Sequence, residues 1–173
     1  FLRLSIRRVV PTSDPNVIFV AAERFTLDDP KDSGGVYRSS DGGATFALVD
    51  PRLAGTATDI IADPMQTSRF YAAVCRKGIF RSDDSGQTWS RIDDAAGAAV
   101  SGIDAAVNIR LALSGGLGRV SRIYAGVVTN GTDSINFGRL MGVFQSQVPA
   151  DGTSYRWNQV GATPASNSCL LYT

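Results

Sequence analysis

Short apolar segments separated by polar turns recur along the whole chain, and they recur as an ordered group. One member of each group has an aromatic residue at its centre, and the three aromatic residues, Phe19, Tyr71 and Tyr124, are spaced by about 52 residues. Another apolar segment precedes each aromatic segment, and a segment that begins with glycine follows it. Short runs of β-branched and aromatic residues between Gly, Pro, Asn and Asp predict β-strands rather than helices.

Each group contains four predicted strands, here called A to D. Strand A lies before a polar turn, B contains the aromatic residue, C ends at serine, and D begins at threonine followed by an aromatic residue. Strands repeated in fours at a fixed period are typical of the blades of a β-propeller. We therefore predict an all-β protein, a β-propeller of four-stranded antiparallel blades with about three blades present. In the first group, strands A, B and C are assigned to 4–10, 17–21 and 35–39. In the second group they are assigned to 58–62, 69–74 and 78–82. In the third group A and B are assigned to 108–113 and 122–127, and C begins at Gly142.

The chain is predicted to be a single partial propeller. Blade 1 takes up about residues 1–50, blade 2 about 58–92 and blade 3 about 108–160, and 161–173 is a candidate start of a further blade. Propellers close with about four to eight blades, so this number leaves the ring open. The remaining blades come from a longer parent polypeptide, from a second copy or from a partner chain. We favour the parent polypeptide, because the chain begins on Phe1 and a half-ring exposes apolar blade faces.

The polar turn between strands C and D repeats almost residue for residue. Ser39–Phe46 and Ser82–Trp89 both have the pattern Ser-x-Asp-x-Gly-x-Thr-aromatic. We expect the aspartate to accept backbone N–H groups of the turn, the glycine to take a positive φ angle, and the aromatic residue to return into the core. This role is structural and needs no ligand. It is assigned to Ser39, Asp41, Gly43, Thr45, Phe46, Ser82, Asp84, Gly86, Thr88 and Trp89.

The motif resembles the Asp-box, also called the BNR repeat, of sialidases, sortilin-type receptors, family-74 xyloglucanases and many bacterial propellers. Ser82–Trp89 fits every position, and Ser39–Phe46 has Phe in place of Trp. A third copy from Ser146 to Trp157 is longer, so Asp151-Gly152-Thr153 reproduces the turn only in part. In these families the Asp-box is a fold element far from the active centre. The resemblance therefore implies a propeller whose functional residues lie on the opposite face.

Composition narrows the classes of function. With 173 residues, 43% of them hydrophobic and 19% charged, the chain is long enough for one globular domain. It contains no histidine, so it cannot by itself build a Ser/His/Asp triad or a histidine zinc site. The net charge is +1 without a basic run, so we expect no nucleic-acid partner. No apolar stretch of about 18 residues is present, so we expect no membrane insertion.

The two cysteines, Cys75 and Cys169, lack metal-ligand spacing. They are either two separate apolar residues of the core or one long-range disulfide, which requires an oxidising compartment.

The loops opposite the Asp-box turns are the B-to-C loops and the D-to-A loops, which join one blade to the next. Here the B-to-C loops differ: 23–34 is long and acidic, 75–77 is tight and basic, and 128–141 is long and polar. Length variation on a constant frame is typical of a recognition surface, and equally of unconstrained loops. The ligand-binding candidates are Arg24, Arg76, Lys77, Asn130, Asp133 and Asn136.

Carboxylates suggest two weaker kinds of site. Asp28, Asp29 and Asp32 offer oxygen ligands for Ca²⁺, although their spacing matches no defined calcium loop and a solvated acidic loop is the alternative. No other cofactor is implied. Glycoside hydrolysis needs two facing carboxylates. Asp59 and Asp104 are the only candidates near the mouth of the central channel that the blades of a propeller surround. Turn or edge-strand roles compete with catalysis at both positions.

These observations leave several functions open. The first is a non-catalytic module of a bacterial extracellular or cell-envelope protein that binds glycan or protein through its B-to-C and D-to-A loop face. The second is part of an Asp-box glycoside hydrolase, sialidase-like or xyloglucanase-like, whose catalytic set is incomplete in this chain. The third is an assembly factor for a membrane complex, since photosystem-assembly propellers carry similar repeats.

Overall fold

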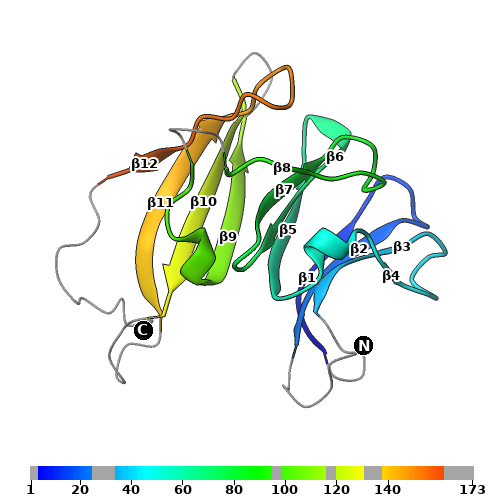
Figure 1. Cartoon of the computed structure of the whole chain (residues 1–173). Helices are drawn as coiled ribbons and strands as arrows, with labels where there is room; N and C mark the ends of the chain where they lie inside the picture. Colours follow the sequence, from blue (N-terminus) through cyan, green and yellow to red (C-terminus); the bar gives the residue numbers. More distant parts are fainter. Residues whose placement is uncertain (1–3, 25–33, 95–98, 116–119, 131–137, 162–173) are drawn as a thin grey trace, which may run out of the picture.

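The computed structural model describes residues 4–24, 34–94, 99–115, 120–130 and 138–161, with the side chain of Arg24 left out (Figure 1). In this part of the chain, twelve strands form three four-stranded sheets, joined in two places by a short 3-10 helix. Sheet 1 contains β1 (Leu4–Pro11), β2 (Ile18–Arg24), β3 (Gly35–Ser39) and β4 (Ala47–Leu48), and η1 (Pro51–Leu53) follows it. Sheet 2 contains β5 (Ala57–Asp63), β6 (Gln66–Val74), β7 (Gly78–Ser82) and β8 (Ser90–Arg91), and η2 (Ile103–Ala105) follows it. Sheet 3 contains β9 (Ala106–Ser114), β10 (Arg122–Thr129), β11 (Arg139–Gln147) and β12 (Asn158–Val160).

Every sheet is an antiparallel meander in which consecutive strands are neighbours. The sheets meet along their first strands, because β5 contacts both β1 and β9. The last strands of the outer sheets, β4 and β12, lie at opposite sides of the molecule (Figure 1). The predicted all-β architecture of four-stranded antiparallel blades is confirmed.

Two apolar cores hold the sheets together, and β6 contributes to both. Successive side chains of a strand point to opposite faces. Phe70 of β6 therefore packs against Phe19 of sheet 1, with ring centroids 4.6 Å apart. Its neighbour Tyr71 lies in the core shared with sheet 3. The central sheet is thus buried on both faces, as its nearly continuous apolar runs require.

Three details differ from the sequence-based assignment. The third strand of sheet 3 begins at Arg139 rather than Gly142, because a bulge at Val127/Val128 lets β10 and β11 pair further toward their loop. Strands β4 and β8 begin after the Thr-aromatic pair, because the backbone N–H and the hydroxyl of each threonine are bonded to the turn aspartate. Phe46 is half-buried instead of lying in the core. Trp89 and Trp157 are buried against the preceding sheet, whereas no described sheet precedes sheet 1.

Among the described residues, no helix is long and apolar enough to cross a membrane.

Candidate functional site

The Asp-box turns are closed by hydrogen bonds within the turn itself. In sheet 1, Asp41 accepts the backbone N–H of Thr45 at 2.9 Å and its hydroxyl at 2.5 Å. Ser39 donates its hydroxyl to Asp41 and accepts the N–H of Gly43 at 2.8 Å. These bonds, led by the one from the Thr45 side chain, lower the pKa of Asp41 to about 2. Its carboxylate is therefore occupied in holding the turn.

The turn of sheet 2 has the same construction. Asp84 accepts both the N–H and the hydroxyl of Thr88, and Ser82 accepts the N–H of Gly86. Burial alone would raise the pKa of Asp84, but the hydrogen bonds from Thr88 and Ser82 lower it.

The longer third turn keeps the aspartate and changes its partners. Asp151 accepts the N–H groups of Thr153 and Ser154 and the hydroxyl of Ser154. The Ser154 hydroxyl is the main cause that lowers the pKa of Asp151 to about 2. Ser146 instead accepts the N–H of Arg156 at 2.9 Å. The third turn thus resembles the other two in part, as predicted: it keeps the aspartate, but the hydrogen-bond partners differ.

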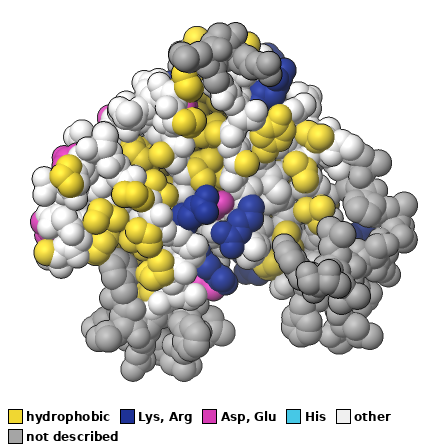
Figure 2. Space-filling model, turned by 180° about the vertical axis from the view of Figure 1, so that it is seen from behind, with side chains coloured by type: hydrophobic (Ala, Val, Ile, Leu, Met, Phe, Trp, Pro, Cys, Tyr) yellow, Lys and Arg dark blue, Asp and Glu magenta, His cyan; other side chains and the backbone are white. Residues whose placement is uncertain are grey.

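The first strands of the two outer sheets, β1 and β9, each carry an arginine that contacts the central strand β5. Arg8 of β1 forms an ion pair with Asp59, its Nε lying 3.3 Å from Oδ1. Arg110 of β9 approaches from the other side and donates from Nη1 to the carbonyl oxygen of Thr58 at 3.1 Å. Seen from behind, basic side chains gather near the centre of the molecule with acidic groups beside them (Figure 2). The two guanidinium groups thus contact consecutive residues of β5 from opposite neighbouring sheets.

Asp59, one of the two catalytic candidates, is committed to structure. It is 2% exposed, and it accepts the N–H of Ile60 at 3.0 Å and that of Leu111 at 2.9 Å, besides pairing with Arg8. Asp104 is exposed on η2. No hydrogen bond or ion pair joins Asp104 to Asp59 in the described part of the chain. The carboxylate of Asp59 thus links sheet 2 to sheets 1 and 3, and its catalytic role stays a prediction.

The B-to-C turn of sheet 2 meets the D-to-A loop of sheet 1. Cys75 donates its N–H to the carbonyl of Thr56 at 2.9 Å. The Lys77 side chain lies beside Gly55, since a Cβ on that glycine would be 3.7 Å from it. Arg76, with φ of 63°, and Lys77 are exposed at the tip of this turn. The predicted grouping of these two loop types on one face is therefore present at this junction.

A further charged pair lies beside this turn. Arg7 of β1 forms an ion pair with Glu23 of β2. Burial is the main cause that raises the pKa of the Cys75 thiol, at the base of the neighbouring Arg76-Lys77 turn. We call Arg7, Glu23, Arg76 and Lys77 the loop-face cluster. It offers several donors and one carboxylate to a ligand.

The other predicted site residues contribute less. Asn130 is exposed directly after β10. Cys75 is a buried free thiol, and no group of three metal-ligating side chains is found among the described residues. The remaining candidates lie outside the described residues: the side chain of Arg24, Asp28, Asp29, Asp32, Asp133, Asn136 and Cys169.

Two features were missed by reasoning from the sequence. Arg110 is the one charged residue of its strand, which is a signal for a special contact, but its partner Thr58 is far away in sequence. The second feature is a polar cavity of about 430 Å³ on sheet 3. It lies at the Asp-box end, away from the loop-face cluster, and is lined by Arg122, Gln145, Ser146, Gln147, Pro149, Ser154, Arg156 and Asn158.

The three sheets and their turns define a partial β-propeller of the Asp-box class. No family model matches the chain. The xyloglucanase Xgh74A of Acetivibrio thermocellus is 29% identical over 89 residues, which cover 46% of this chain and 11% of that protein. The crystal structure of an ancestral GH74 enzyme superposes with a TM-score of 0.63 at 18% identity, covering 91% of this chain and 20% of that one.

The GH74 xyloglucanase of Xanthomonas campestris superposes with a TM-score of 0.56 at 21% identity, covering 92% of this chain and 24% of that one. The chain is thus distantly similar to GH74 xyloglucanase propellers and spans no more than about a quarter of the length of these three relatives. At these identities the structural likeness establishes the fold.

Proposed function

We propose that this chain is part of a non-catalytic propeller module that binds a glycan through its B-to-C and D-to-A loop face. The observation that carries the proposal is the junction of the Arg76-Lys77 turn with the loop at Gly55. It presents two exposed cationic side chains, Arg76 and Lys77, and the Arg7–Glu23 ion pair lies on the neighbouring sheet 1. Guanidinium, ammonium and carboxylate groups suit the hydroxyl groups of a sugar, which donate and accept hydrogen bonds.

The choice of a glycan is supported by the similarity to a xyloglucanase. A protein ligand is the alternative. It would be favoured if the titration described below detects no binding to any glycan. We predict a location outside the cell or in the cell envelope, where such glycans are found.

The test is calorimetric titration of the full-length protein with a panel of oligosaccharides that includes xyloglucan fragments. The double variant Arg76→Ala/Lys77→Ala should weaken binding about tenfold or more, as expected for loss of charged hydrogen bonds. Gln87→Ala, on the exposed Asp-box turn of the same sheet, is the control and should leave binding unchanged. Wild-type affinity in the double variant, or no binding to any glycan, would contradict the proposal.

The second candidate function is part of a xyloglucanase-like glycoside hydrolase, and the sequence match over 89 residues favours it. The test is turnover of xyloglucan by the full-length protein and by its Asp104→Asn variant. A loss of turnover of about a hundredfold or more with an unchanged melting temperature would support catalysis by Asp104. Asp59→Asn is less informative, because Asp59 holds two sheets together. The assembly-factor function stays a prediction.

A further inference from the structure

The Asp-box end of sheet 2 carries a network in which arginines and carboxylates balance each other. Asp83, the residue after Ser82, accepts from Nε of Arg69 at 2.7 Å and from Nη2 of Arg81 at 2.8 Å. Arg69 also forms an ion pair with the buried Asp63, its Nη1 lying 3.4 Å from Oδ2. Two guanidinium groups are thus neutralised by two carboxylates of the same sheet.

The corresponding positions of sheet 3 keep one arginine and neither carboxylate. The two sheets are aligned by their cross-strand pairs, Tyr71 with Arg81 in sheet 2 and Tyr124 with Gln145 in sheet 3. The residues of sheet 3 at the four positions are Arg122 for Arg69, Gln145 for Arg81, Gln147 for Asp83 and Ser114 for Asp63. Arg122 therefore has the place of a doubly paired arginine, without a carboxylate at either partner position.

Three of these four positions line the polar cavity of about 430 Å³ on sheet 3. Arg156 lines it together with Arg122, and both residues are exposed. Neither guanidinium forms an ion pair within the part of the chain that the structure describes, and the lining residues include no carboxylate. Asp151 binds the hydroxyl of Ser154 at this cavity, but its carboxylate is held by the turn. The cavity thus carries two positive charges that sheet 3 does not balance.

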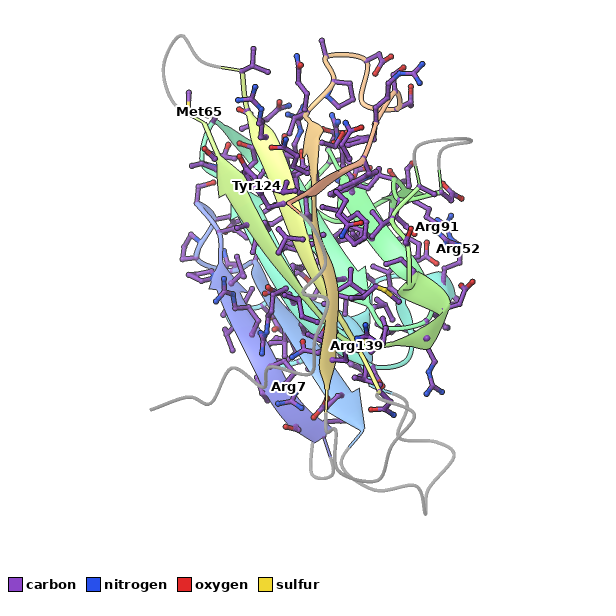
Figure 3. All side chains as sticks on the ribbon, turned by 90° about the vertical axis from the view of Figure 1, so that its left-hand side faces the viewer. Arg7, Arg52, Met65, Arg91, Tyr124 and Arg139 are labelled. Carbon is purple, nitrogen blue, oxygen red and sulfur yellow. The ribbon has the colours of Figure 1, made fainter. Side chains whose placement is uncertain are left out.

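The cavity lies at the end of the sheet, where solvent still reaches when another sheet packs alongside. Tyr124 is half-buried on the open face of sheet 3, the face turned away from sheet 2, and Figure 3 turns this face toward the viewer. Arg139, labelled in the same view, marks the opposite end of the sheet (Figure 3). In sheet 2, the side chain of Asp83 is 47% exposed although sheet 3 packs on that sheet. The equivalent site of sheet 3 would likewise stay accessible in a longer propeller.

We propose that this cavity binds a saccharide that bears a carboxylate, such as a uronic acid, and that Arg122 and Arg156 hold the carboxylate. The ligand would supply to Arg122 the negative charge that Asp83 supplies to Arg69 in sheet 2. The planar guanidinium group matches a carboxylate through two parallel hydrogen bonds, which makes arginine the preferred residue for this recognition.

The rest of the lining favours a saccharide over other acids. Gln145, Gln147 and Asn158 present amide groups, which donate and accept hydrogen bonds as sugar hydroxyls do. Pro149 is the single apolar residue among the lining residues. The volume lies within the roughly 300–1,000 Å³ that is usual for small-molecule sites. The proposal does not depend on the ligand of the loop face, because the two sites lie at opposite ends of the sheets.

The test is calorimetric titration of the full-length polypeptide with trigalacturonic acid, with neutral cellotriose and acidic triglutamate as comparison ligands. Trigalacturonic acid should bind about tenfold or more tightly than either, and less tightly as the salt concentration rises, because exposed charges are screened. No binding, or equal affinity for cellotriose, would overturn the proposal. Tighter binding of triglutamate would overturn the saccharide and identify an acidic peptide as the ligand.

A variant that restores the missing carboxylate tests the site itself. In Gln147→Asp the new carboxylate takes the position of Asp83, so it should pair with Arg122 and weaken the binding of trigalacturonic acid about tenfold or more. Its melting temperature should stay within about 2 °C of wild type, because Gln147 is exposed. Gln159→Asp adds the same charge on the other face of β12, opposite Phe144, and should change the affinity by about twofold or less. Wild-type affinity in Gln147→Asp would overturn the proposal.

Separate variants distinguish this cavity from the loop face. The double variant Arg76→Ala/Lys77→Ala should leave the binding of trigalacturonic acid unchanged, because its two residues lie at the B-to-C turn of sheet 2. Loss of this binding in the double variant, with none in Gln147→Asp, would place the acidic saccharide on the loop face. That result would overturn the present proposal and leave glycan binding by the loop face standing.

Discussion

The carboxylate of Asp59 on β5 accepts the backbone N–H of Leu111 on β9 at 2.9 Å, and this bond ties the first strands of sheets 2 and 3 together. Its neighbour Thr58 makes a similar contact, since its hydroxyl donates to the carbonyl of Ile109 at 2.9 Å and lies 3.1 Å from the Ile109 nitrogen. Adjacent side chains of one strand thus occupy backbone groups that the next sheet leaves unpaired at its inner edge. Such groups are costly when buried without a partner.

Removing this tie should destabilise the protein. Asp59→Ala leaves two buried N–H groups and the Arg8 guanidinium without their acceptor, so we expect a loss of about 2–4 kcal/mol in the free energy of unfolding. Urea denaturation measures it. Asp59→Asn keeps one acceptor oxygen and should cost less. Asp104→Asn, at an exposed position, should change stability by about 0.5 kcal/mol or less. Equal losses of stability at Asp59 and Asp104 would contradict the role of Asp59 in joining the sheets.

The Asp-box turns should make stability depend on acidic pH. The pKa values of Asp41 and Asp151 fall from the ordinary 3.8 to about 2 in the folded protein. A lowered pKa in the folded state contributes stability that is present above the ordinary value and lost as pH falls through the folded value. The melting temperature should therefore decrease as the pH is lowered from about 4 to about 2. Asp41→Asn should reduce this dependence, and an unchanged pH profile in that variant would contradict the prediction.

Two glycines of the turns provide a matched pair. Both have positive φ angles, but a Cβ on Gly86 would collide with the ring of Phe19, whereas Gly42 has open space around it. Gly42→Ala should cost about 1 kcal/mol for the backbone angle alone. Gly86→Ala should cost that amount and about 2 kcal/mol more for displacing the ring. Chemical denaturation of the two variants compares these costs, and similar losses would show that the contact with Phe19 is readily relieved.

The buried hydroxyl of Tyr155 should contribute to the stability of the protein through its hydrogen bonds. Burial raises the pKa of both Tyr71 and Tyr155, so both hydroxyls stay protonated near neutral pH. Tyr155→Phe removes the acceptor of Arg81 and the partner of Tyr71, and we expect a loss of about 1–3 kcal/mol by denaturant unfolding. Tyr124→Phe on the open face is the control, with an expected change of about 0.5 kcal/mol or less in the 173-residue chain.

Most of the local architecture was predictable from the sequence. Strand periodicity and the repeated turn motif located all three sheets, because alternation and turn chemistry act over a few residues. The burial of Phe46 was predicted wrongly by analogy with Trp89, because its burial depends on a preceding sheet rather than on the turn. The start of β11 was placed too late, since the bulge in β10 has no clear local signal.

Local sequence specifies the repeating unit: four strands, a turn closed by Asp41 or Asp84, and a glycine where φ is positive. Which units meet, and through which groups, follows only from the folded arrangement of the sheets. That arrangement brings Arg8 of sheet 1 and Leu111 of sheet 3 to the same carboxylate of Asp59, so this side chain links three sheets. These contacts join residues about 50 positions apart, so they depend on how the sheets pack and not on the pattern within either strand.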